Sequence, residues 1–293
     1  MRPYGQTINI RTHGIKNKNT NSRLFSYNHP ILKSKNGSTK FLDRVIVKFF
    51  NRTLDRVIYY TEDSYKWALQ NKLIDKSKAF WANNTIDNTE INKNYNFALP
   101  PNNEVRILFI GRLIPSKRLV DLIAYYTELK NDIHGLKLDI IGDGPERELV
   151  KNLAKEDNDV TWYGTLINEF DISPIMAKCT LVFVPGHSGL SINHAFAYGR
   201  PYLTLKGPSH APELDYIDNA VNGYVLTGNF NENIGVIKSL LLNRLKLEQF
   251  CNKAKEKGSY LSVQNWVQQL KNSLLHGHRG VYCMDLGVYI VWT

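Results

Sequence analysis

Short apolar runs alternate with longer amphipathic stretches along the chain from about residue 105 onward. The runs are rich in Val, Ile and Leu and occupy residues 105–111, 136–142, 160–164, 180–185, 201–205 and, more weakly, 224–228. Helical patterns cover residues 117–130, 145–155, 168–177, 190–199, 231–242, 246–257 and 262–275. Strands and helices that alternate at this period predict an α/β domain, with a parallel sheet covered by helices on both faces.

The first hundred residues show the same alternation less completely. We expect strands at residues 7–13, 55–61 and 79–85, and helices at 41–54 and 64–72. A polar stretch with two prolines follows and is typical of an interdomain linker. The pattern therefore predicts a partial N-terminal domain at 1–100, a complete C-terminal domain at 101–277 and an atypical apolar tail at 278–293.

Composition adds a charge asymmetry to this picture. The 293-residue chain carries 37 Lys and Arg against 27 Asp and Glu, for a formal net charge of +10. Residues 1–100 hold 17 of these cations and 7 of the anions, whereas residues 101–293 hold 20 of each, so the whole excess lies in the first third.

Several classes of protein are disfavoured by the same sequence. A hydrophobic content of 43% is too high for a disordered chain. No run of about 18 apolar residues is present to cross a membrane, and the first residues lack the apolar core of a secretory signal. Three widely separated cysteines form neither a disulfide framework nor a zinc-binding spacing. These features favour a cytoplasmic protein with reduced thiols.

One predicted strand-to-helix junction carries two cations. Arg112 follows the strand at 105–111, and Lys117 opens the next helix. Ligands of open α/β folds bind at the carboxyl ends of parallel strands. Two cations beside a helix N-terminus suit a diphosphate, because the charges and the free amides both favour an anion. The alternative is a solvated loop with ordinary surface cations.

A second junction lies in the segment PGHSGLSINHAFAYGRP at 185–201. Its glycines allow the backbone to approach a ligand closely, and the amides at 189–191 would form an anion nest. His194 lies one turn into the following helix, where it faces the same cleft or has a structural role. The sequence contains no Asp-x-Asp, HExxH or Cys/His cluster, so we expect no metal site.

Residues 105–245 resemble the donor-binding half of the group 1 glycosyltransferases, which have the GT-B fold. The resemblance rests on the order of GRLIPSKR (111–118), IGDGPERE (141–148), VTWYG (160–164), GLSINHAFAYGRP (189–201) and PELDYIDNAVNGYVL (212–226). Residues 7–87 are similar to the second half of that family's N-terminal domain. The resemblance implies a GT-B-like α/β fold and transfer of a sugar from a UDP- or GDP-linked donor, with retention and without a metal or other cofactor.

The resemblance also implies roles for single residues. These are diphosphate binding by Arg112, Lys117 and the amides of Gly189, Leu190 and Ser191; ribose or sugar binding by Gly186, His194 and Glu213; and catalysis by His13. The family often carries glutamates at positions 186 and 194. Neutral imidazole at 194 accepts one hydrogen bond from a ribose hydroxyl, while the sugar contact of the first glutamate is absent.

Three functions remain open at this point. The leading hypothesis is a glycosyltransferase of bacterial surface polysaccharide synthesis that acts on a glycan or lipid-linked acceptor. Since the N-terminal resemblance covers half a domain, the second is a truncated remnant, or one half of a split enzyme, that only binds a nucleotide sugar. The third is a basic nucleic-acid-binding protein, which the zero net charge of the better-defined domain disfavours.

The helix expected at 41–54 holds part of the excess charge. Arg44, Lys48 and Arg52 are spaced four residues apart, beside an apolar stripe that includes Val45 and Phe49. This arrangement suits a helix that lies on an anionic membrane, at the inner face of the plasma membrane if the acceptor is lipid-linked. The alternative is an amphipathic core helix with a solvated cationic face.

Overall fold

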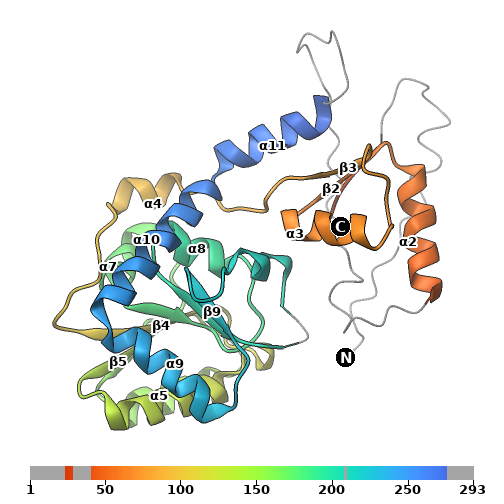
Figure 1. The fold of residues 1–293 in the computed structure, drawn as a ribbon. Coiled ribbons are helices and arrows are strands. Elements are labelled where there is room, and N and C mark those ends of the chain that lie inside the picture. The colour runs from red at the N-terminus through yellow and green to blue at the C-terminus, as the bar shows by residue number, and fades with distance from the viewer. Residues whose placement is uncertain (1–23, 29–40, 208–209, 276–293) are drawn as a thin grey trace. The chain divides into compact units, whose positions relative to one another are not determined.

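The computed structural model describes residues 24–28, 41–207 and 210–275, which divide into two compact units (Figure 1). Unit 1 comprises Met1–Asn84 and Trp266–Thr293, and unit 2 comprises Thr85–Asn265. The strand expected at 7–13, which carries His13, and the tail at 278–293 lie outside the described residues.

Unit 2 is built on a six-stranded parallel sheet with the strand order β6-β5-β4-β7-β8-β9. In chain order its strands are β4 (Val105–Ile110), β5 (Leu136–Ile141), β6 (Val160–Trp162), β7 (Leu181–Phe183), β8 (Tyr202–Leu205) and β9 (Gly223–Leu226). The chain moves outward from β4 to β6, returns to β7 beside β4, and then moves in the other direction. This reversal places a topological switch point between β4 and β7.

Helices cover both faces of this sheet. They are α5 (Leu119–Asp132), α6 (Arg147–Glu156), α7 (Glu169–Lys178), α8 (Ser191–Ala197), α9 (Phe230–Leu242) and α10 (Arg244–Tyr260). Because parallel crossovers are right-handed, α5 and α6 lie on one face of the sheet and α7 and α8 on the other. α9 packs against α5, and α10 packs against α8, so each face receives a further helix (Figure 1).

The strands of unit 2 are apolar along their whole length because both faces are covered. Leu108, Phe109, Leu138, Ile140 and Phe183 are all fully buried in one continuous core. The predicted doubly wound α/β domain is therefore confirmed, and every apolar run that indicated a strand in this region contains one.

The segment expected to be a linker folds onto unit 2 instead. α4 (Thr89–Asn94) packs against α7, with Ile91 buried in the core. The fully buried Arg200 donates to the carbonyl oxygen of Ala98 at 2.9 Å and to the hydroxyl of Tyr95 at 3.0 Å. Unit 2 thus begins at Thr85, whereas the polar composition of this segment had suggested a boundary near residue 100.

The described residues of unit 1 form three parallel strands in the order β1-β2-β3. They are β1 (Phe25–Asn28), β2 (Arg56–Tyr59) and β3 (Ala79–Trp81), accompanied by α2 (Phe41–Thr53) and α3 (Glu62–Gln70). The strand β1 was not predicted, because four residues of mixed polarity give no periodic signal. The core of this unit is small and includes Leu54, Val57, Tyr59, Ala68 and Ala79.

The last described helix, α11 (Val263–Leu275), completes unit 1 from the far end of the sequence. The indole of Trp266 donates to the hydroxyl of Tyr27 at 3.1 Å. The side-chain oxygen of Gln269 accepts from the backbone amide of Asn83 at 2.8 Å. Unit 1 is therefore assembled from two segments that lie almost two hundred residues apart.

Candidate functional site

Two loops meet at the switch point between β4 and β7. The loop after β4 runs into the short 3-10 helix η2 (Pro115–Lys117), and the loop after β7 leads into α8. The amide of Gly186 donates to the carbonyl oxygen of Lys117 at 3.1 Å, and the amide of His187 donates to that of Ser116 at 2.7 Å. The two sequence-predicted junctions are thus joined directly through their backbones.

Gly186 allows this close approach. A Cβ atom at this position would lie 2.1 Å from the carbonyl oxygen of Ser116 and 2.5 Å from the carbonyl carbon of Lys117. No side chain fits in such a space without separating the loops. Gly186 thus has a packing role that leaves no space for a larger side chain, which gives the missing glutamate a steric explanation.

The Lys117 side chain is a half-buried cation with one hydrogen-bond partner. Its ammonium donates to the carbonyl oxygen of His187 at 2.5 Å. Burial, followed by the charge of Arg112, lowers the pKa of Lys117 to about 8. Within the described ranges no carboxylate pairs with it, so its charge is compensated only by a peptide dipole.

Arg112 stands beside Lys117 and is exposed. Its guanidinium makes no hydrogen bond or ion pair with any described residue. Two neighbouring cations without a counter-ion repel each other, and an anion between them would relieve that repulsion. The predicted pair of cations is therefore brought together in a form that favours anion binding.

The start of α8 adds backbone donors to the same edge of the sheet. The amides of Gly189, Leu190 and Ser191 donate to no group in the described part of the chain, and no side chain caps this helix. The Ser188 hydroxyl, fully buried, bonds instead to the carbonyl oxygen of Gly186 at 3.0 Å. This hydroxyl holds the loop in place and leaves the amides of 189–191 available to a ligand.

Glu213 lies against this loop. It is buried in the 3-10 helix η3 (Pro212–Tyr216), and a Cβ atom at Gly189 would lie 3.7 Å from its Oε2. The structure thus brings Glu213 to the amides of the second junction. Its carboxylate is the acidic group nearest to them that the described contacts identify.

His210 was missed by sequence reasoning. Its Nε2 lies 2.8 Å from the carbonyl oxygen of Leu205, and its Nδ1 accepts from the amide of Ser188 at 3.2 Å. These contacts require hydrogen on Nε2 and a lone pair on Nδ1. Burial is the largest cause that lowers the pKa of His210, and the nearby charge of Lys117 adds to it. A neutral His210 therefore holds the loop that contains Ser188 in place.

His194 takes part in a polar network on the side of α8 that faces α7. Its Nε2 lies 2.8 Å from Oε1 of Glu169, the first residue of α7. The hydroxyl of Tyr198 donates to Oε2 of Glu169 at 2.6 Å. Glu169 was missed by sequence reasoning, because nothing in the sequence signals a contact across 25 residues.

Comparison with known proteins decides the family. A model of the family described as glycosyl transferases group 1 matches residues 90–257, which is more than half of the chain. The chain belongs to the group 1 glycosyltransferases. No curated protein sequence matches it.

Solved structures of glycosyltransferases share the fold of this group 1 member. A TarM variant from S. aureus, in complex with fondaparinux, alpha-GlcNAc-glycerol and UDP, has a TM-score of 0.63 at 20% identity over 86% of this chain. Anabaena HepE in complex with UDP and glucose has a TM-score of 0.59 at 21% identity over 87% of this chain. A GtfA/B complex reaches a TM-score of 0.68 at 17% identity. At these low identities the TM-scores show a shared fold and no more. They confirm the predicted GT-B-like architecture.

The length of the match differs among these structures. The chain spans 51% of the TarM variant and 55% of the GtfA/B chain, and it spans 72% of HepE. Roles that depend on the whole of those proteins are therefore taken up below as proposals.

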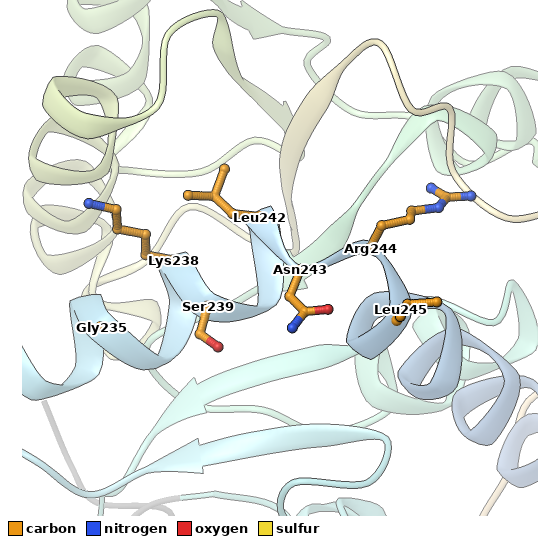
Figure 2. A pocket seen from close by; sticks show the side chains of 7 residues that line it. All are labelled: Gly235, Lys238, Ser239, Leu242, Asn243, Arg244 and Leu245. Carbon is orange, nitrogen blue, oxygen red and sulfur yellow. The ribbon is translucent and has the colours of Figure 1, made fainter.

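A hollow of about 530 Å³ in this glycosyltransferase lies away from the switch point, where α9 meets α10 (Figure 2). Its two cations already have partners. Lys238 pairs with Asp132 at 2.8 Å, and Arg244 pairs with Glu248 at 2.8 Å. Since both charges there are already paired, we place the functional site at the switch point instead.

The basic helix α2 of the glycosyltransferase exposes apolar side chains as well as cations. Arg44, Lys48 and Arg52 are exposed, as predicted. Ile46 and Phe49 are 49% and 65% exposed, so part of the apolar stripe faces outward rather than into the core. The side chains of Phe41 and Leu42 lie outside the description.

Two further observations concern the described residues of the glycosyltransferase. No helix among them combines the length and apolar character needed to cross a bilayer. They also contain no group of three His, Cys, Asp or Glu side chains arranged to hold a metal ion.

Proposed function

We propose that this chain transfers a sugar from a nucleoside diphosphate sugar, UDP- or GDP-linked, to a glycan or lipid-linked acceptor. The observation that carries the proposal is the pair Arg112 and Lys117. These cations lie at the switch point without a carboxylate partner, and the pKa of Lys117 is lowered to about 8 by burial and by Arg112. Such a pair is destabilising until an anion binds, and a diphosphate is an anion of the right charge.

In this proposal different residues of the site bind different parts of the donor. Arg112 and Lys117 bind the diphosphate, and the amides of Gly189, Leu190 and Ser191 bind its distal phosphate. Glu213 lies beside these amides, on the side of the sugar. His194 accepts a hydrogen bond from a ribose hydroxyl, and His13 acts near the donor sugar. The TarM and HepE structures, both in complex with UDP, support a nucleotide ligand for this fold.

The proposed reaction breaks the bond between the anomeric carbon and the diphosphate oxygen, which keeps the electron pair. A hydroxyl of the acceptor forms the new bond to that carbon, with retention, and its proton passes to the departing diphosphate oxygen. Negative charge therefore grows on the diphosphate as the bond breaks. Arg112, Lys117 and the amides at the start of α8 stabilise that charge, so the proposal assigns no metal to the reaction.

Isothermal titration with UDP and GDP tests the donor site. We expect one of the nucleotides to bind, and Arg112→Ala or Lys117→Ala to weaken that binding about tenfold or more, since hydrogen bonds to charged groups contribute about 1.5–3 kcal/mol. Lys253→Ala is the matched control, because Lys253 is an exposed lysine of α10 paired with Glu256. Absence of binding by either nucleotide would refute the proposal.

Enzyme and binding protein are separated by a second assay. Incubation with the UDP- or GDP-linked sugar should release the free nucleotide, through transfer or slow hydrolysis. Nucleotide binding without any release would instead support a remnant that only binds its ligand.

We also propose that the glycosyltransferase works in the cytoplasm, in bacterial surface polysaccharide synthesis, with α2 on an anionic membrane. The exposed Phe49 and Ile46 lie among three exposed cations, which is the composition of an interfacial helix. Cations near an anionic membrane contribute about 1 kcal/mol each.

Vesicle sedimentation tests this membrane contact. The protein should sediment with anionic vesicles more than with neutral ones, and Arg44→Ser/Lys48→Ser/Arg52→Ser should lose the difference. Lys66→Ser on α3, an exposed lysine paired with Glu62 at 2.9 Å, is the control. Equal recovery with neutral and anionic vesicles would overturn the electrostatic contact.

A further inference from the structure

His194 is held by a carboxylate that comes from another helix. Its Nε2 lies 2.8 Å from Oε1 of Glu169, and Oε2 of Glu169 accepts from Tyr198 at 2.6 Å. The hydroxyl of Ser173 lies 2.7 Å from that of Tyr198. Glu169 and Ser173 belong to α7, and His194 and Tyr198 belong to α8 or its C-cap. The chain of contacts therefore joins two consecutive helices across the loop and strand that separate them.

Hydrogen-bond chemistry fixes the direction of each contact in this network. An ionised carboxylate only accepts, so Nε2 of His194 donates to it. Tyr198 gives its one hydrogen to Glu169, and Ser173 then donates to Tyr198. Burial alone would raise the pKa of Glu169, but the hydrogen bond and electrostatic attraction from His194 and the hydrogen bond from Tyr198 outweigh it and hold that pKa below its usual value. The network is thus consistent throughout with an ionised Glu169.

The same network decides what the other ring nitrogen of His194 offers. With hydrogen on Nε2, the Nδ1 of a neutral imidazole is an acceptor. No described residue makes a hydrogen bond to this atom. The side chain is 13% exposed, and the residue lies one turn after the amides of 189–191. In that form Nδ1 suits a hydroxyl donor and does not suit a phosphate oxygen.

We propose that Glu169 is a positioning residue, which orients His194 so that Nδ1 accepts a hydrogen bond from a ribose hydroxyl of the nucleotide. This inference rests on the proposed donor site. It adds to that site a residue from α7, and it divides the work between two side chains: Glu169 provides the negative charge and His194 provides the contact.

The pairing also accounts for the imidazole at position 194. A glutamate there, as the family often has, would place a second carboxylate beside Glu169, close to the point where Nε2 now donates. Two carboxylates at that distance repel each other. The imidazole keeps a hydrogen-bond acceptor for the ligand and makes an attractive contact with Glu169.

The test compares UDP and GDP with their 2′,3′-dideoxy forms, which lack the ribose hydroxyls. In the wild-type protein the natural nucleotide should bind about tenfold more tightly than its dideoxy form, because the dideoxy form leaves the imidazole acceptor without a donor. His194→Ala and Glu169→Met should remove this preference. Glu169→Gln should retain most of it, because the amide oxygen still accepts from Nε2. Glu256→Met, the same substitution at an exposed glutamate of α10, should leave the preference intact.

The outcomes separate this inference from the donor site itself. Equal binding of natural and dideoxy nucleotides by the wild-type protein would overturn the ribose contact and leave the donor site standing. A full preference in Glu169→Met would overturn the positioning role alone. If neither UDP nor GDP binds, both the donor site and the ribose contact are overturned. Thermal unfolding of each variant checks that it is folded.

A second variant tests the repulsion directly. His194→Glu should bind the natural nucleotide less tightly than the wild type. The double variant His194→Glu/Glu169→Gln should recover the lost affinity. If His194→Glu alone binds as tightly as the wild type, the pairing with Glu169 does not constrain position 194 and the proposal fails.

Discussion

Arg200 and Lys117 are both cations inside unit 2, but they meet very different numbers of acceptors. Arg200 is fully buried and donates to the carbonyl oxygens of Met176, Ala177 and Ala98 and to the hydroxyl of Tyr95. Lys117 has one carbonyl oxygen and a neighbouring cation, Arg112. Complete satisfaction of a buried charge indicates a structural part, whereas incomplete satisfaction indicates a place for a ligand.

The largest expected effect is on the structural cation. Arg200→Met should lower the free energy of unfolding by about 3 kcal/mol or more, because several buried carbonyl oxygens lose their donor. The loss should include release of residues 95–98 from unit 2. Denaturant unfolding measures the first effect, and hydrogen exchange of this segment measures the second. If both remain as in the wild type, the contrast between the two cations is wrong.

Lys117→Met should have the opposite signature. Nucleotide binding should fall by more than tenfold, while the free energy of unfolding should rise by roughly 1–3 kcal/mol at pH 7, since one unit of pKa shift corresponds to about 1.4 kcal/mol. Titration calorimetry measures the nucleotide binding, and denaturant unfolding of the same preparation measures the free energy of unfolding. A variant that loses stability together with binding would show that Lys117 is structural.

The pH dependence sharpens the same point. The folded-state pKa of Lys117, about 8, lies below its usual value of 10.5. Between these values the unfolded chain binds more protons, so the Lys117 contribution to unfolding free energy should rise with pH. Nucleotide binding should weaken over the same range, by at most tenfold per pH unit. The difference between wild type and Lys117→Met in both measurements isolates this group, and a difference that does not change with pH would contradict the assignment.

The smallest effect is expected at His210. Its lowered pKa means that the unfolded chain binds more protons just below pH 6.5, so its contribution to stability should decrease as the pH falls through that range. His210→Gln keeps a donor for Leu205 and an acceptor for Ser188, and it should remove this decrease. Thermal unfolding between pH 5 and pH 7 gives the comparison. Parallel curves for the two proteins would exclude the effect.

Much of unit 2 could be predicted because its signals are local. Strands buried on both faces need continuous apolar runs, and the two loops at the switch point follow from the order of strands and helices. Arg112 and Lys117 are close in sequence, so their proximity was also predictable. The close approach of Gly186 to the backbone of Ser116 could not be predicted, because it joins two loops that are about 70 residues apart.

The features that were missed depend on contacts between distant segments. Glu169 meets His194 because α7 and α8 lie on the same face of the sheet, which no spacing in the sequence reveals. The linker prediction failed for a related reason. The segment is polar, as a linker would be. However, Arg200, more than a hundred residues away, supplies the donors that fix residues 95–98 to unit 2.

The discontinuity of unit 1 has a consequence for synthesis on the ribosome. Its strands are made first, but Trp266 and Gln269 of α11, which bond to Tyr27 and Asn83, are made after all of unit 2. At about 5–20 residues per second, the delay between these segments is about 10–40 s. Unit 2 can finish folding within that interval. Unit 1 stays incomplete until its last helix is synthesised, so it is exposed to chaperones and proteases for the longest time.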